Sequence, residues 1–195
     1  MIELAPRHKF GLTLESPLMP ASGTFGYGDA YKDFVELSCL GAVVTNPVSW
    51  RSRRAASGQR IGVRDRHFVV HTGWPNLGLR RVVRRYREVW ARSPVPVIVH
   101  LLATRPSEVH RAVARLSGIP GVRGVELGFV ADAEPERALS LLNAAVADGD
   151  LPVIAQIPFG RVGELAAPFV NHGADALALT APPRAVLPLD SGPVG

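Results

Sequence analysis

The sequence predicts an α/β fold in which helices cover a parallel sheet. Short runs of consecutive apolar residues alternate along the chain with segments of helical spacing. Strands buried on both faces, as in parallel sheets, have such continuous apolar runs. Small or polar residues follow the predicted strands, and these are Ser22, Asn46, His100, Gln156 and Thr180. Because barrels carry their sites at that end of the strands, the placement favours a TIM (β/α)8-type barrel over a doubly wound open sheet.

Length and composition are those of one folded domain, so we expect residues 1–195 to form a single barrel domain. Cys39 is the only cysteine, which excludes an intrachain disulfide, and its apolar surroundings predict a buried structural thiol. The N-terminus has no signal-type apolar region, and no apolar run approaches the roughly 20 residues that cross a membrane. We therefore expect a cytoplasmic protein with no membrane partner.

The net charge is +5, and arginine outnumbers lysine by 20 to 2. Residues 51–66 and residues 80–92 each contain six arginines. Such density can attract nucleic acid or an anionic ligand, but no nucleic-acid motif or interleaved aromatic residues accompany it. A solvated helix face is the favoured interpretation, and a nucleic-acid partner is a minor alternative.

The first half of the chain has irregular patterning. Two short extended pieces in residues 1–18 predict an N-terminal hairpin, and residues 17–21 predict a strand. Tyr31, Phe34, Val35 and Leu37 have helical spacing, so a helix is expected over residues 29–40, with Gly41 as a left-handed cap. Residues 42–45 predict a buried strand. Residues 46–78 are expected to be an irregular loop, too long for an ordinary connection and therefore functional.

From residue 79 onward the alternation is regular. Helices are predicted at residues 79–90, 106–116, 134–146 and 161–171, and strands at residues 96–102, 124–130, 151–157 and 175–180. With the two earlier strands, about six βα-type strands are expected, and the chain does not reach the helix after the sixth.

Residues 19–28 form a glycine-rich stretch that can support a flat ligand. Ala21, Ser22 and Gly23 project nothing larger than a hydroxymethyl group, so a planar ring can lie against the backbone. A simple turn after a strand is the alternative interpretation. No G-x-G-x-x-G follows an early strand, which argues against a dinucleotide site. The six histidines show no HxH or HExxH pattern and no CxxC is present, so no metal site is expected.

Three features of the sequence resemble motifs of the class 1 dihydroorotate dehydrogenases, a family of FMN-dependent barrels of pyrimidine (UMP) biosynthesis. PLMPASGTFG at residues 17–26 resembles the segment that contacts the flavin, and GWPNLG at residues 73–78 resembles the substrate loop. The strand sequences PVIV, LPVI and GADAL recur in order, followed by SGP. The resemblance implies an eight-stranded barrel with FMN at its carboxyl-terminal mouth and a small-molecule substrate.

The resemblance also assigns site residues. Those expected to bind the cofactor are Ala21, Ser22, Gly23, Thr45, Asn46, His100 and Gln156. Asn76 and Gly78 are expected to shape the loop that meets the substrate.

Several departures mark the chain as a divergent member. Asn46 and Gln156 stand where the family has lysines, His100 and Gly128 stand where it has asparagines, and Ala131 replaces the catalytic cysteine. An alanine methyl cannot accept a proton. Neutral side chains in place of the lysines should weaken FMN binding and lower the flavin's reduction potential.

Three residues are candidates to replace the lost acid or base, and each has a structural alternative. His100 follows an apolar strand and is either a base or a packed, hydrogen-bonded histidine. His71 is either an acid or base beside the substrate loop or an exposed loop histidine. Asp132 is either a base or the N-cap of the next helix.

The family's last two strands, seven and eight, which grip the FMN phosphate, follow the segment that matches residues 191–193. We therefore expect an incomplete barrel, with a fragment, a homo-oligomer, a second completing chain or an altered fold as alternatives. The favoured function is an FMN flavoprotein oxidoreductase acting on CH–CH bonds, with a substrate that can differ from dihydroorotate. The alternative is a degenerate, non-catalytic barrel (a pseudoenzyme) or a partner-binding subunit.

Overall fold

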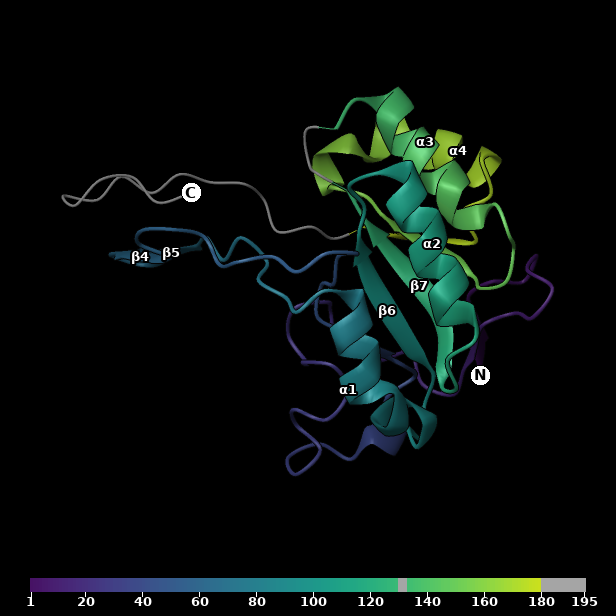
Figure 1. Ribbon diagram of the computed structural model, residues 1–195, viewed down its shortest axis with the longest axis horizontal. Coiled ribbons are helices and arrows are strands. Elements are labelled where there is room, and N and C mark those ends of the chain that lie inside the picture. Colours follow the sequence, from purple (N-terminus) through teal and green to yellow (C-terminus); the bar gives the residue numbers. More distant parts are fainter. Residues whose placement is uncertain (130–132, 180–195) are drawn as a thin grey trace.

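The centre of the molecule is a curled, five-stranded parallel sheet (Figure 1). The computed structural model describes residues 1–129 and 133–179. The strands are β3 (Val43–Val44), β6 (Val97–Leu102), β7 (Val122–Gly128), β8 (Val153–Gln156) and β9 (Ala176–Ala178). Their spatial order follows their order in the chain. A doubly wound sheet reverses direction at one point, whereas this sheet winds one way, as one part of a barrel wall does.

In the part of the chain that the structure describes, four helices cover the outer face of the sheet. They are α1 (Leu79–Ala91), α2 (Pro106–Ser117), α3 (Pro135–Val146) and α4 (Val162–Asn171), the last preceded by a 3₁₀ turn, η2 (Phe159–Arg161). These helices and the strands from β6 onward lie within two residues of the predicted boundaries where the structure describes them. The six arginines of residues 80–92 are exposed, which confirms the solvated helix face.

The two faces of each strand are separated by the two-residue period of β structure. Val97, Val99 and Leu101 of β6 pack in the main core beneath the helices, whereas Ile98 packs in a second core on the inner face. His100 follows Ile98 by one period and is buried on the inner side as well.

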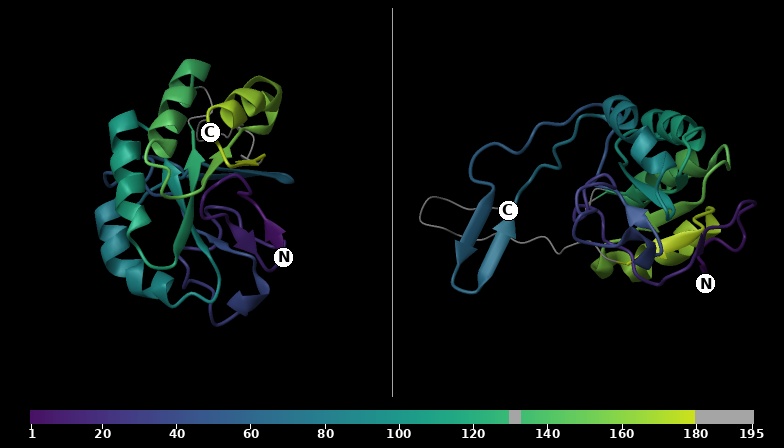
Figure 2. Two further views of the ribbon diagram at one scale, coloured as in Figure 1. Left: turned by 90° about the vertical axis from the view of Figure 1, so that its right-hand side faces the viewer. Right: turned by 90° about the horizontal axis from the view of Figure 1, so that it is seen from below.

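The N-terminal hairpin covers the inner face at the amino ends of the strands. It pairs β1 (Ile2–Glu3) with β2 (Thr13–Leu14), as predicted, and lies on the side of the sheet opposite α1 and α2 (Figure 2, left). The inner core that it completes consists of Ala5, Leu12, Leu14, Ala42, Val44, Ile98 and Ile154. The hairpin therefore closes one end of the interior, and the carboxyl ends of the strands stay available for a site.

Two predictions in the first half of the chain were wrong. Residues 17–21 form no strand, because Pro17 and Pro20 have no N–H to donate to a neighbouring strand. Residues 29–40 form turns and one 3₁₀ turn, η1 (Leu37–Cys39), instead of a helix, and Gly41 is not left-handed. Phe34 is 85% exposed and Tyr31 is 44% exposed, so a core covers only part of the expected apolar face, and a short helix depends on such packing.

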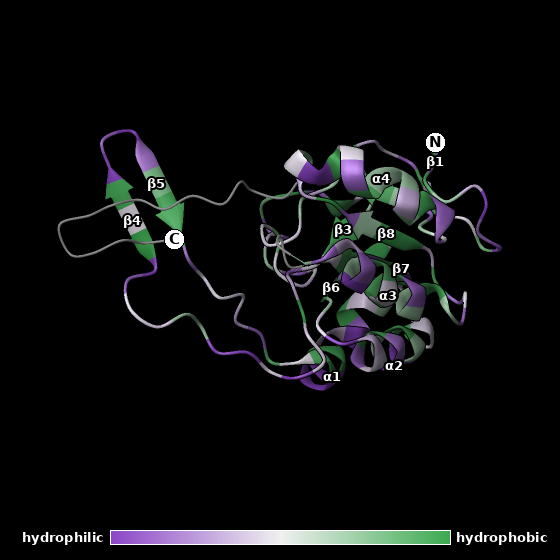
Figure 3. Cartoon of the chain, turned by 90° about the horizontal axis from the view of Figure 1, so that it is seen from above, coloured by the Kyte–Doolittle hydropathy of each residue, from purple (hydrophilic) through white to green (hydrophobic). Residues whose placement is uncertain are grey.

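Cys39 and the long loop also differ from expectation. Cys39 is exposed rather than buried, although its neighbours Leu37 and Leu40 pack against a small buried cluster. Residues 46–78 contain a second hairpin, β4 (Ile61–Arg64) with β5 (His67–Val70), at the end of an arm that projects from the body (Figure 3). In the part of the chain that the structure describes, no helix is long and apolar enough to cross a membrane.

Gly41 sets how closely the segment before β3 approaches that strand. Its N–H donates to the Leu18 carbonyl at 2.8 Å, and an added Cβ would overlap the Ser16 carbonyl oxygen. We expect Gly41→Ala to lower the free energy of unfolding by about 1–3 kcal/mol, measured by urea denaturation. Gly163→Ala is the control, since its Cβ would meet nothing within 4 Å. Equal stability of the two variants would contradict this prediction.

Glu3 ties the N-terminal hairpin together, and its contribution should depend on pH. The Thr13 hydroxyl, at 2.6 Å, and then the backbone N–H groups of Leu12 and Ala5 hold the pKa of this carboxyl below its ordinary value of 4.5. A depressed folded-state pKa means that the stabilisation is present above the ordinary value and is lost as the pH falls through the folded-state value. Glu3→Gln should therefore reduce the acid sensitivity of unfolding in denaturant titrations across this range. The exposed Glu15→Gln is the control.

Candidate functional site

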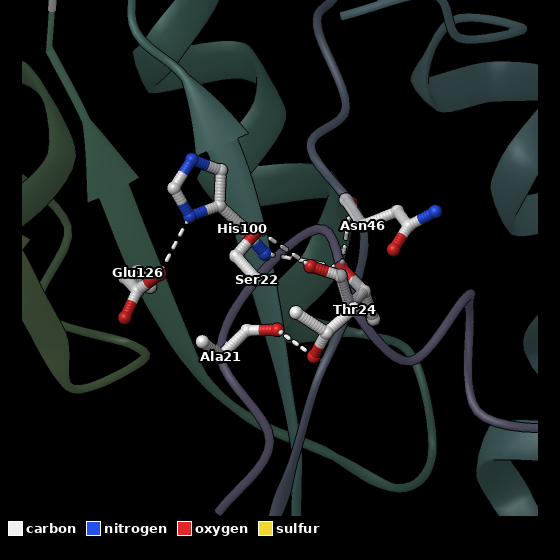
Figure 4. A network of polar contacts seen from close by, with 7 residues as sticks. Ala21, Ser22, Thr24, Asn46, His100 and Glu126 are labelled. Atoms are coloured by element: carbon white, nitrogen blue, oxygen red, sulfur yellow. Dashed lines mark hydrogen bonds and ion pairs between the residues drawn. The ribbon is translucent and has the colours of Figure 1, made fainter. Parts of the chain in front are cut away.

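The glycine-rich segment lies beside the free edge of β3, at the carboxyl ends of the strands. The Ser22 hydroxyl donates to the Thr45 carbonyl at 2.9 Å (Figure 4). The Asn46 N–H donates to the Gly26 carbonyl at 2.6 Å. Within the segment, the Thr24 hydroxyl donates to the Ala21 carbonyl at 2.6 Å. The segment thus occupies the place of a neighbouring strand without the regular pairing of one.

Aromatic residues anchor the far end of this segment to α1. The Trp90 indole N–H donates to the Tyr27 carbonyl at 2.7 Å, and an added Cβ at Gly28 would lie 3.6 Å from the Trp90 ring. The Tyr27 hydroxyl donates to the Pro47 carbonyl at 3.4 Å. Burial, with a smaller effect of Tyr86, raises the pKa of Tyr27 to about 12, so the phenol stays a neutral donor. These contacts hold residues 26–28 against α1 and the loop after β3.

Thr45 joins the segment to the next strand. It is fully buried directly after β3, and its hydroxyl oxygen accepts the His100 N–H at 3.1 Å while the hydroxyl donates to the Asn46 carbonyl, also at 3.1 Å. Both hydrogen bonds of the Thr45 hydroxyl are therefore made to the protein backbone, one just after β3 and the other within β6.

His100 and Glu126 form a buried pair on the inner face. Nδ1 of His100 lies 2.6 Å from Oε1 of Glu126, and the two side chains are 4% and 9% exposed. The two residues are register partners on the parallel strands β6 and β7, so their side chains meet directly. Sequence reasoning did not select Glu126. The available signal was a carboxylate at an inward position of an apolar strand.

At the mouth, an exposed stretch of backbone lies near a buried hydrogen-bond acceptor. Ala21 and Gly23 are exposed, and an added Cβ at Gly23 would meet nothing within 4 Å. Oδ1 of Asn46 is buried and has no hydrogen-bond partner among the described residues. Gln156 ends β8 half-buried, in register with Gly128 on the neighbouring strand. A flat ring with an N–H at its edge fits this arrangement, because the acceptor is otherwise unsatisfied.

Asn76 and Gly78 shape the base of the projecting arm. Asn76 is buried, its Nδ2 donates to Ser49 Oγ and to the Trp74 carbonyl at 3.1 Å each, and its Oδ1 accepts the Gly78 N–H at 2.9 Å. Gly78 has φ +81°, and an added Cβ would lie 2.7 Å from the Ser52 nitrogen. Both residues are tied to the loop after β3, and the Asn76 side chain is fully used there.

The remaining candidates do not join this network. His71 is exposed on the arm beside β5. Asp132 lies outside the described residues, as do Ala131 and Thr180. Within residues 1–129 and 133–179, no group of three or more histidine, cysteine or acidic side chains is placed to hold a metal ion.

Two surface hollows lie away from the mouth. One is at the amino ends of β6 and β7, lined by residues 93–96 and 117–123. The other lies between the arm and α2 and includes Arg51, which is 3.3 Å from Glu108. Neither is lined by the residues assigned to the cofactor.

The family model described as dihydroorotate dehydrogenase matches residues 6–125. The chain belongs to the dihydroorotate dehydrogenase family. The match contains the glycine-rich segment, the arm and His100, and it ends one residue before Glu126. It therefore covers the part of the fold that builds one side of the mouth.

Curated relatives agree with this membership. The chain is 31% identical over 181 residues to the dihydroorotate dehydrogenase B (NAD(+)) catalytic subunits of Desulforudis audaxviator and Pelobacter propionicus, and 28% identical to that of Citrifermentans bemidjiense. These alignments cover 87% of this chain but only 59–60% of the relatives. The chain thus spans about three fifths of the length of the relatives it matches.

Removing the Asn76 side chain should loosen the arm. We expect Asn76→Ala to lower the free energy of unfolding by about 1–3 kcal/mol, because it leaves the buried Gly78 N–H and Ser49 without their partner. The exposed Asn143→Ala should change it by less than about 0.5 kcal/mol. Thermal and urea unfolding measure both, and proteolysis within residues 51–77 should accelerate only in Asn76→Ala.

Proposed function

We propose that this chain is a flavoprotein oxidoreductase of the dihydroorotate dehydrogenase type, which binds FMN across the mouth of the curled sheet. The observation that carries the proposal is the mouth network, in which Ser22 and Thr45 hold a small-residue segment open beside the partnerless Oδ1 of Asn46. Family membership supports it, because the matched region contains this segment. By the same membership we infer a role in pyrimidine biosynthesis in the cytoplasm.

The residues at the mouth fit the ring of FMN. The backbone of Ala21 and Gly23 offers a face against which the ring can lie, and Asn46 Oδ1 can accept a ring-edge N–H. Gln156 supplies a neutral amide from the neighbouring side of the mouth. Bound FMN would supply the hydride acceptor for oxidation of a CH–CH bond.

We propose that the substrate is a small polar ring of the dihydropyrimidine class, dihydroorotate among the candidates, and that the site contacts it through residues other than those the family uses. Asn76, assigned to the substrate loop by resemblance, uses its side chain on Ser49, Trp74 and Gly78. Position 128 is a glycine where the family has an asparagine, and Ala131 replaces the cysteine base. A site without these partners loses discrimination for the original ring.

We also propose that further strands complete the wall of the barrel. In the described residues, β3 and β9 are the outer strands of the sheet, and β3 is flanked by the glycine-rich segment. The relatives, which are named as catalytic subunits, are longer than the aligned region. A second copy or another chain beside β9 would cover the interior and supply the contacts to the FMN phosphate.

A non-catalytic barrel that binds a partner is the second candidate. Its specific support is the loss of the cysteine base together with both flavin-facing lysines, now Ala131, Asn46 and Gln156. This candidate predicts a folded protein that ignores FMN.

Titration with FMN distinguishes the two functions. We expect the purified chain to bind FMN saturably, followed by flavin absorbance and fluorescence quenching. Asn46→Ala should weaken the affinity about tenfold, the cost of one hydrogen bond from a buried acceptor, whereas the exposed Asn171→Ala should not change it. A protein that is folded by circular dichroism but shows no saturable FMN binding would contradict the flavoprotein proposal and favour the second candidate.

A further inference from the structure

The buried pair His100 and Glu126 has a chemical property beyond its position near the mouth. If Glu126 is a carboxylate, it has no proton to donate, and the 2.6 Å contact then places the proton on Nδ1 of His100. In a neutral imidazole, Nε2 then carries a lone pair. Glu126 therefore makes Nε2 the proton-accepting end of the ring, as carboxylates do for catalytic and metal-binding histidines.

Gly128 provides the space in which this end of the ring lies. An added Cβ at Gly128 would overlap Nε2 of His100 and would lie 2.8 Å from its Cε1. The ring thus lies over the backbone of Gly128, one period beyond Glu126 on β7. Any side chain at position 128 would displace the imidazole, so the histidine and the glycine depend on each other.

Nε2 faces no competing partner in the described part of the chain. The structure gives it no hydrogen bond there, whereas Nδ1 and the backbone N–H are both used, by Glu126 and Thr45. The Thr45 contact also ties His100 to the network that holds the glycine-rich segment (Figure 4). His100 is therefore joined, through its backbone, to the residues that hold the glycine-rich segment.

We propose that His100 is the proton-accepting residue of this site, with Glu126 as its positioning residue and Gly128 as the position that gives the ring room. The proposal rests on the proposed flavoprotein function and supplies the base that Ala131 cannot provide. In oxidation of a dihydropyrimidine-type ring, one carbon would lose its proton to Nε2. The adjacent carbon would lose a hydride, with its electron pair, to the oxidised flavin, which leaves a C=C bond in the substrate. The imidazolium formed on His100 would be neutralised by Glu126.

A purely structural pair is the competing explanation. Buried ion pairs contribute little net stability compared with apolar residues, because desolvation offsets their attraction. Strands β6 and β7 are already joined by six register pairs, three of which are between apolar residues buried in the main core. A structural pair would lower stability when broken but would leave proton transfer unaffected.

The first arm of the test reads the tautomer directly, by ¹⁵N NMR of the imidazole nitrogens in the ligand-free full chain. The proton is expected on Nδ1 in the wild type and in Glu126→Gln, whose amide oxygen can still accept it. It should redistribute between the nitrogens in Glu126→Leu. Glu108→Gln, which removes a different buried carboxylate, should match the wild type. A proton fixed on Nε2 in the wild type would overturn the proposal without any reference to FMN.

The second arm measures anaerobic reduction of bound FMN by dihydroorotate in rapid mixing, beside FMN affinity for each variant. His100→Gln keeps a donor to Glu126 but has no basic nitrogen, and it should slow reduction by about 10²–10⁴-fold. The reduction rate is compared at FMN concentrations that saturate each variant, which separates loss of the base from weakened binding of the cofactor. Glu126→Gln should also slow reduction at saturating substrate, and Gly128→Ala should do so by displacing the ring.

The outcomes separate the two proposals. Reduction of FMN by His100→Gln at the wild-type rate would overturn the role of His100 and leave the flavoprotein function standing. Failure of the wild type to bind FMN, or to be reduced by dihydroorotate when FMN is bound, would contradict the reaction step, while the NMR arm still decides whether Glu126 sets the tautomer. Slow reduction in His100→Gln with retained FMN would support the proposal.

Discussion

The requirement that every parallel strand bury both of its faces underlies the rest of this structure. The two-residue period of β6 sends Val97, Val99 and Leu101 to the helices and Ile98 and His100 to the interior. The helices satisfy the outer face. The inner face needs a different cover at each end, since the chain offers apolar contacts at one end and polar groups at the other.

The N-terminal hairpin provides the apolar cover. Leu12 and Leu14 pack with Ile98 and Ile154 at the amino ends of the strands. The Leu12 side chain approaches Gly124, where a Cβ would lie 3.4 Å from it. Once this end is closed, inward residues one period further along the strands, His100, Glu126 and Gln156, are left at the other end. The polar mouth is therefore a consequence of how the sheet is sealed below it.

Charge is distributed unevenly between the mouth and the surface. The arginines that dominate the composition lie on the exposed face of α1 and along the arm, where water screens them. The mouth, in contrast, has neutral amides at Asn46 and Gln156 and one buried carboxylate, which is matched by an imidazole. A ligand there meets hydrogen-bonding groups rather than fixed positive charge. The family, in contrast, is expected to have two lysines at these positions.

The sequence alone determined the second half of the fold, because there each apolar run is long enough to be buried on both faces and each helix has an amphipathic pattern. It also identified the family, and through the motifs it predicted which residues line the mouth. It did not determine residues 17–40, because helical spacing of Tyr31 and Phe34 produces a helix only when a core covers them, and both side chains are largely exposed. Only the tertiary structure paired His100 with Glu126, 26 residues apart in the chain, because parallel register decides which inward side chains meet. The same holds for the space over Gly128, which depends on a ring that reaches across from the neighbouring strand.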